Sequence, residues 1–176
     1  MRGQAEAATT RIGTEPAVDD GLEVLCADHR RLQELLAELG SDSGSRSANV
    51  YGRRRAADAL VAELRAHLAA EDRCLHPMLG ELRSDGRASI ERETADREKM
   101  ADFMDTLLGA GPMENTFAPA AAHLLGHVER HIARQEETLF PLLFESAGPD
   151  QLAALGEQLR QAKAGTTPEL DGEPPG

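Results

Sequence analysis

Apolar residues recur three and four positions apart along several stretches of the chain, the spacing that places them on one face of an α-helix. Polar or Gly- and Pro-containing breaks separate these stretches at 41–49, 84–86, 109–112 and 148–150. We therefore predict long helices over 19–40, 50–82, 88–108 and 113–146, and a shorter fifth over 149–163. Short connections favour antiparallel neighbours. The pattern thus predicts an all-α fold, an up-down-up-down antiparallel four-helix bundle with a short fifth helix.

The two ends of the chain lack this periodicity. Residues 1–18 and 165–176 are expected to be flexible N- and C-terminal tails, which leaves 19–164 as one bundle domain. Within it, HLAAEDRCLHPML at 67–79 aligns in register with HIARQEETLFPLL at 131–143, so the bundle consists of two similar helical hairpins. Pro77 and Pro141 occupy equivalent places in this repeat, and we expect each to end or bend its helix.

Composition agrees with helices and excludes several classes of protein. Leu and Ala number 23 and 28 against 8 Val plus Ile, which excludes an all-β fold. Lys plus Arg number 19 and Asp plus Glu 31, a formal charge of −12 that argues against nucleic acid or an anionic membrane as partner. No apolar run approaches the roughly 20 residues of a membrane span. Two distant cysteines without a CxxC pair fit a reducing compartment, so we expect a cytoplasmic protein.

Polar residues interrupt the apolar face of every long helix. They are His29, His67, Glu71, Glu93, Asp96, His131 and Gln135. In an antiparallel bundle these interruptions fall at one height. A buried, uncompensated carboxylate costs several kcal/mol, and a bound cation would remove that cost. Imidazole and carboxylate donors without thiolate suit iron, manganese or zinc. We therefore predict a metal site inside the bundle.

Three motifs carry a resemblance to a known family. Asp28-His29-Arg30, the HxxxE from His67 to Glu71, and His131 followed by Glu136 and LFP resemble a hemerythrin-like (HHE cation-binding) domain over roughly 19–146. The resemblance implies a four-helix bundle around a non-heme di-iron centre that binds dioxygen or a related small ligand, such as nitric oxide or peroxide. Some members of the family sense iron, oxygen or redox state.

The resemblance also implies roles for individual residues. His29 and His67 match terminal ligands of one iron, Glu71 and Glu136 match the bridging carboxylates, and His131 matches a ligand of the second iron. Gln135 stands where the first half of the repeat has Glu71, and its amide is neutral. The carboxylate of this helix that matches the family pattern is therefore the next residue, Glu136.

The third helix departs from the family pattern. The family supplies one or two histidines there, whereas ASIERETADREKMADFM contains none. Asp96 stands about where the principal histidine is expected, with Glu93 one turn before it, and both are candidate replacements. His127, one turn before His131, is another candidate, whereas His123 is too distant to ligate.

The sequence is compatible with several functions. The leading hypothesis is a cytoplasmic non-heme iron protein with two irons that binds dioxygen, nitric oxide or peroxide, or senses or stores iron. Whether it is an enzyme is left undecided. One alternative is a degenerate, metal-poor bundle acting as a regulatory or partner-binding module, and another is a single iron or zinc. Cys26 and Cys74, each near the metal layer, are either a redox-sensitive pair or two separate thiols. The protein partner and the oligomeric state stay undetermined.

Overall fold

The computed structural model describes residues 20–40, 46–83 and 86–165, and these residues form helices and short connections without any strand. In chain order the helical elements are α1 (Gly21–Gly40), α2 (Arg46–Ala70), η1 (Glu71–Leu75), α3 (His76–Leu82), α4 (Gly86–Gly109), α5 (Phe117–Arg134), η2 (Gln135–Leu139), α6 (Phe140–Ser146) and α7 (Pro149–Ala164). The two elements η1 and η2 are single π-helical turns.

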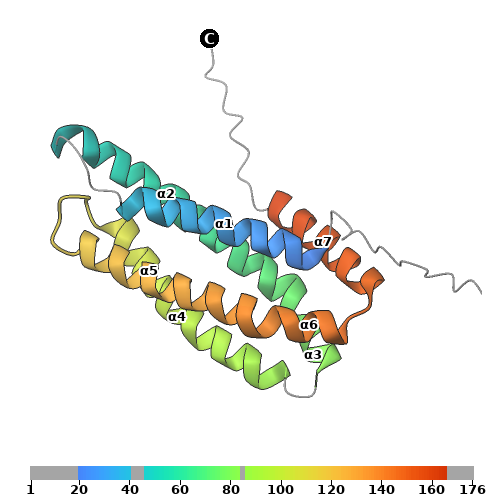
Figure 1. Cartoon of the computed structure of the whole chain (residues 1–176). Helices are drawn as coiled ribbons and strands as arrows, with labels where there is room; N and C mark the ends of the chain where they lie inside the picture. Colours follow the sequence, from blue (N-terminus) through green and yellow to red (C-terminus); the bar gives the residue numbers. More distant parts are fainter. Residues whose placement is uncertain (1–19, 41–45, 84–85, 166–176) are drawn as a thin grey trace, which may run out of the picture.

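Four antiparallel rods make up the bundle (Figure 1). α1 and α4 are two of them, and the other two are the continuous runs α2–η1–α3 and α5–η2–α6. α1 packs against α2, and α4 packs against α5, while α7 packs along α1 at the end of the bundle that holds α3 and α6 (Figure 1). The predicted all-α bundle with a short fifth helix is confirmed.

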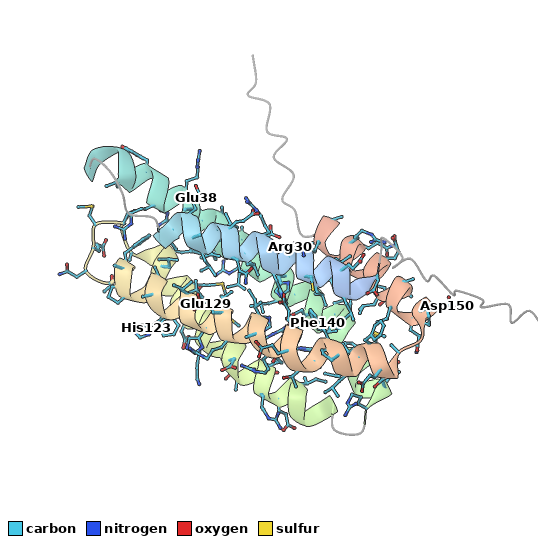
Figure 2. The ribbon with its side chains drawn as sticks, in the orientation of Figure 1. Arg30, Glu38, His123, Glu129, Phe140 and Asp150 are labelled. Carbon is cyan, nitrogen blue, oxygen red and sulfur yellow. The ribbon has the colours of Figure 1, made fainter. Side chains whose placement is uncertain are left out.

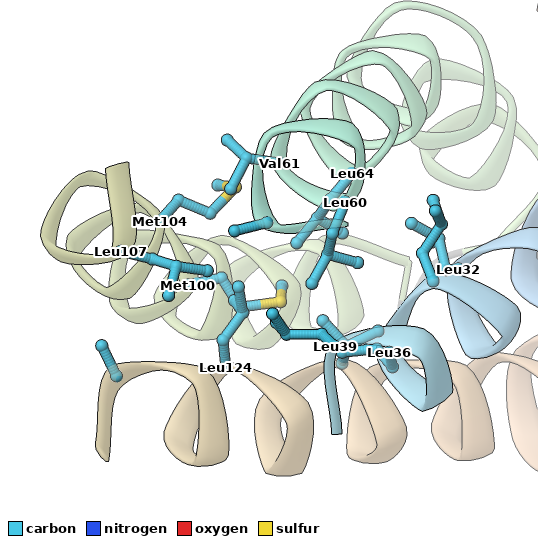
Figure 3. Packing of buried hydrophobic residues seen from close by; sticks show 14 of the residues in the cluster. Leu32, Leu36, Leu39, Leu60, Val61, Leu64, Met100, Met104, Leu107 and Leu124 are labelled. Atoms are coloured by element: carbon cyan, nitrogen blue, oxygen red, sulfur yellow. The ribbon is translucent and has the colours of Figure 1, made fainter. Parts of the chain in front are cut away.

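Two apolar clusters fill the bundle, one toward each end. The larger contains four leucines of α1 and mainly leucine, alanine and methionine side chains of α2, α4 and α5, which interdigitate as Figure 3 shows. The four leucines are Leu32, Leu35, Leu36 and Leu39. The other contains Leu25, Leu75, Leu143 and Leu155, from four different elements. Buried polar residues lie between the two clusters, since His29 falls between Leu25 and Leu32 along α1.

The prolines follow the π-turns instead of ending the helices. The N–H of His76 donates to the carbonyl of Glu71, five residues back, and the N–H of Phe140 does the same to Gln135. A proline in an α-helix lacks one N–H and clashes with the carbonyl four residues before it. The wider π-turn before Pro77 and Pro141 accommodates that ring, so both helices continue for several residues.

Three further expectations from the sequence concern the tails, membrane-spanning helices and the cysteines. The predicted tails 1–18 and 165–176 lie, apart from Gly165, outside the described residues. Within the described ranges, none of the helices combines the length and hydropathy needed to cross a membrane. Cys26, half-buried, and Cys74, buried, are both free thiols.

Candidate metal centre

Four buried side chains from four elements converge in the middle of the bundle. They are His29 of α1, His67 of α2, Glu71 of η1 and His131 of α5, all without exposed surface. One ligand atom of each lies within 4.8 Å of the others, and among the described residues this is the group of His, Cys, Asp and Glu able to hold a metal ion. The antiparallel rods create it, because residues distant in sequence reach the same height.

The inner nitrogens of two imidazoles, those of His67 and His131, face one carboxylate oxygen. Glu71 Oε1 lies 3.2 Å from His67 Nε2 and 3.4 Å from His131 Nε2, and these two nitrogens are 3.4 Å apart. The Nε2 atom of His29 is buried without a hydrogen-bond partner, although its ring lies 5.1 Å from the ring of His67, centroid to centroid. A buried nitrogen without a partner is costly, and a metal ion would satisfy it.

The outer nitrogen of each ring faces a carboxylate of its own. His29 Nδ1 lies 2.7 Å from Glu136 Oε1 and His131 Nδ1 lies 2.8 Å from Glu93 Oε2, while His67 Nδ1 is 3.4 Å from Asp28 Oδ2. These carboxylates are Glu136, Glu93 and Asp28. A carboxylate that accepts the Nδ1–H leaves the Nε2 lone pair directed inward, the arrangement typical of metal-ligating histidines. The donor set therefore fits a transition metal.

The neighbouring imidazoles keep Glu71 in its carboxylate form. Burial acts against charge on Glu71, yet the neighbouring imidazoles of His67 and His131 hold its pKa well below the usual value. Burial likewise opposes the charged form of His131, but the Glu71 charge, with hydrogen bonds that His131 donates to Glu71 and Glu93, raises its pKa to about 9. Burial and the nearby His67 lower the pKa of His29. The Glu71 carboxylate thus favours a positive charge beside it. Without a metal, the proton on the neighbouring imidazole of His131 supplies part of that charge.

Two further polar residues contact Glu71, and the sequence patterns did not single out the first of them. Arg97 of α4, about nine-tenths buried, donates from Nη2 to Glu71 Oε2 at 2.7 Å, and it also pairs with Asp72. Gln135 of η2 donates from Nε2 to Glu71 Oε1 at 2.6 Å, and its own Oε1 has no partner. Arg97 stands four residues after Glu93, so it shares that helical face, and this spacing was the available signal.

The two acidic candidates of the third predicted helix, Glu93 and Asp96, take different positions in the structure. Glu93 is buried and binds His131 from outside, while its other oxygen accepts a hydrogen bond from Arg134 at 2.8 Å. Asp96 pairs with Arg134 and keeps about a quarter of its side chain exposed. At 100° per residue the inward face of α4 runs through 93, 97 and 100, so Asp96 lies at its edge, outside the four-residue group.

The remaining candidates lie around the group. Glu136 supports His29 from outside and is 41% exposed. His127 is half-buried beside Phe103, with ring centroids 5.5 Å apart, and lies outside the four-residue group. His123 stacks on Phe103 at 5.0 Å, on the part of α5 away from Phe140 (Figure 2). Phe140 itself stacks on the ring of His29 at 5.6 Å.

The fold and the site together define the class of protein. It is a helical bundle with a buried group of His and Glu side chains that can hold a metal ion. The chain matches the family model of the hemerythrin HHE cation binding domain over residues 20–143, and it belongs to this family. α7 lies beyond the matched residues.

A solved structure supports the fold. The crystal structure of a hemerythrin HHE cation binding domain-containing protein from Mycobacterium kansasii, a homolog of Rv2633c, matches with a TM-score of 0.69 at 22% identity. The match covers 84% of this chain and 86% of the other. No curated protein matches the chain.

Proposed function

We propose that this protein binds iron through His29, His67, Glu71 and His131, and that the bound metal takes up a small ligand such as dioxygen, nitric oxide or peroxide. The observation that carries the proposal is the grouping of three buried imidazoles around Glu71, with the Nε2 atoms of His67 and His131 near Glu71 Oε1 and the buried Nε2 of His29 left unpartnered. Membership of a cation-binding family supports it. Sensing or storing iron is an equivalent use of the same site.

The residues around the site have separable tasks. Glu136, Glu93 and Asp28 hold the three rings in the tautomer that offers Nε2. The apolar clusters on both sides exclude bulk water, so polar interactions inside the layer are stronger than at the surface. When bound, iron supplies a change of oxidation state and open coordination positions, because four protein donors do not complete a six-coordinate shell.

Metal content tests the first half of the proposal. We expect protein produced with added iron and purified without chelator to retain iron, and His67→Ala to lose it. His123→Ala is the matched control, since His123 lies outside the donor group, and it should retain iron. Iron content by inductively coupled plasma mass spectrometry, with circular dichroism to verify helicity, measures this. Equal iron in His67→Ala and wild type would remove these residues as ligands.

Ligand binding tests the second half. Anaerobic addition of nitric oxide to the ferrous protein should change its visible absorption spectrum, and the same addition to His67→Ala should not. If the iron-loaded wild type shows no change with nitric oxide, dioxygen or peroxide, the ion has a structural role.

A second function is favoured by one specific observation. Arg97 already neutralises Glu71 within the protein, so the polar layer is compatible with a metal-poor bundle that acts as a regulatory or partner-binding module. Wild-type protein that binds no iron, cobalt or zinc, and still unfolds cooperatively, would favour this alternative.

A further inference from the structure

We infer that the centre holds one metal ion per chain, because the buried guanidinium of Arg97 takes the side of Glu71 that a second ion would need. The inference rests on the proposed function and deepens it by fixing the number of ions.

The two oxygens of Glu71 face different partners. Oε1 faces the Nε2 atoms of His67 and His131 at 3.2 and 3.4 Å, whereas Oε2 accepts the hydrogen bond from Arg97 Nη2 at 2.7 Å. A carboxylate that bridges two ions offers one oxygen to each. The guanidinium cannot lose its proton in a protein, so Oε2 stays committed to Arg97.

The other carboxylates on this side of the layer are also committed. Glu93 binds His131 through one oxygen and Arg134 through the other, at 2.8 Å in each case. Asp96 pairs with Arg134, and Asp72 pairs with Arg97. Two arginines thus pair with the acidic groups of η1 and α4 that could otherwise ligate a second ion.

Electrostatics acts in the same direction. Arg97 is about nine-tenths buried, and a divalent ion at Glu71 Oε2 would lie against this fixed positive charge, where solvent screens the repulsion little. Displacing Arg97 would break its ion pairs with both Glu71 and Asp72. The Nε2 atoms of His67 and His131 remain on the Oε1 side, and His29 belongs to the same four-residue group. The arrangement therefore supports a three-histidine, one-carboxylate site for a single ion.

Metal stoichiometry tests the inference. Titration of the chelator-treated full chain with Co(II), followed by absorption and by metal analysis after gel filtration, should end at one ion per chain. Arg97→Lys keeps the buried cation and should also end at one. The double variant Arg97→His with Gln135→Glu replaces the cation by an imidazole and adds a carboxylate, and it should bind a second ion.

Controls separate the outcomes. Arg92→His adds an imidazole on the exposed face of the same helix and should stay at one ion. Electron paramagnetic resonance of the loaded wild type should show an uncoupled ion, a readout that does not depend on any variant folding. Two ions in the wild type, a coupled pair in its spectrum, or a folded double variant that stays at one would overturn the inference. A wild type that binds no ion would instead overturn the proposed function.

Discussion

His131 lies between two carboxylates, Glu71 at its inner nitrogen and Glu93 at its outer nitrogen. This placement explains how a fully buried imidazole keeps a proton in the metal-free protein. Its pKa is raised from 6.5 to about 9 although burial acts in the opposite direction. The same two contacts would serve the proposed metal site, because Glu93 would orient the ring and Glu71 would join it as a ligand.

The raised pKa predicts how the stability of metal-free protein depends on pH. A folded-state pKa above the unfolded value contributes stability that is fully present below pH 6.5 and is lost as pH rises through about 9. The loss is up to about 3 kcal/mol for such a shift. His67, which also faces Glu71, has a raised pKa and acts in the same direction. Urea unfolding at pH 6.5 and 9 measures the change.

The matched variant for this prediction is His131→Gln, which keeps a polar side chain but cannot take up the proton. Its unfolding free energy should change less between the two pH values than that of the wild type. If the two proteins lose stability in parallel, the pH dependence arises elsewhere in the molecule.

At the scale of elements, α7 contributes to the polar layer although it lies beyond the residues that match the family model. Lys163 Nζ lies 2.5 Å from Asp28 Oδ1 and 3.0 Å from Glu63 Oε1. Asp28 in turn faces His67, and hydrogen bonds from His67 and Lys163 lower its pKa against the effect of burial. The fifth helix therefore contacts the ring of His67 through one carboxylate.

Lys163→Met should weaken metal binding without removing any ligand. Residues that orient a ligating histidine typically contribute about 10–100-fold in affinity, and we expect about a 10-fold loss, measured by competition with a chromophoric chelator. Arg160→Met, on the same helix and paired with Glu157, should leave the affinity unchanged. Equal affinities for the Lys163 variant and the wild type would show that α7 does not act on the site.

Close packing of α7 on α1 predicts a second, purely structural effect. A Cβ added at Gly21 would lie 2.6 Å from Leu155 Cγ, so Gly21→Ala should lower the free energy of unfolding by about 1–3 kcal/mol. Gly52, exposed in α2, has nothing within 4 Å of an added Cβ, and Gly52→Ala should stabilise by up to about 1 kcal/mol. Thermal and urea unfolding of both variants measure this. Equal effects of the two substitutions would contradict the close approach.

At the scale of the whole molecule, the polar layer joins two apolar clusters that share no buried residue. A metal ion bound by this group would contact α1, α2, η1 and α5 at once. These elements come together only in the folded state, so the ion would bind that state and not the unfolded chain. Ligand binding to the folded state alone stabilises it by mass action.

Metal loading should therefore raise the thermal midpoint. Free metal at 100 times its dissociation constant adds about 2.7 kcal/mol, which corresponds to roughly 5–10 °C for a domain of this size. Differential scanning calorimetry with and without chelator measures the shift, and His67→Ala should show none. A shift of equal size in that variant would place the stabilising ion elsewhere.

The sequence by itself determined the helices, their antiparallel order and the height of the polar layer, because apolar spacing and chain breaks are local signals. It also determined His29, His67, Glu71 and His131 as candidate ligands, which the structure brings together. It did not show the π-turns before Pro77 and Pro141, since a change of helix type depends on how the whole rod packs.

Only the tertiary structure decided which residues of α4 face the centre. Asp96 and Arg97 are neighbours in sequence, and a rotation of α4 by less than one residue exchanges which of them points inward. Packing against α5, α3 and α2 sets that rotation, and it turns Arg97 toward Glu71 and Asp96 toward Arg134. A local pattern contains the candidates, but the charge that lies against the buried carboxylate depends on contacts among three separate elements.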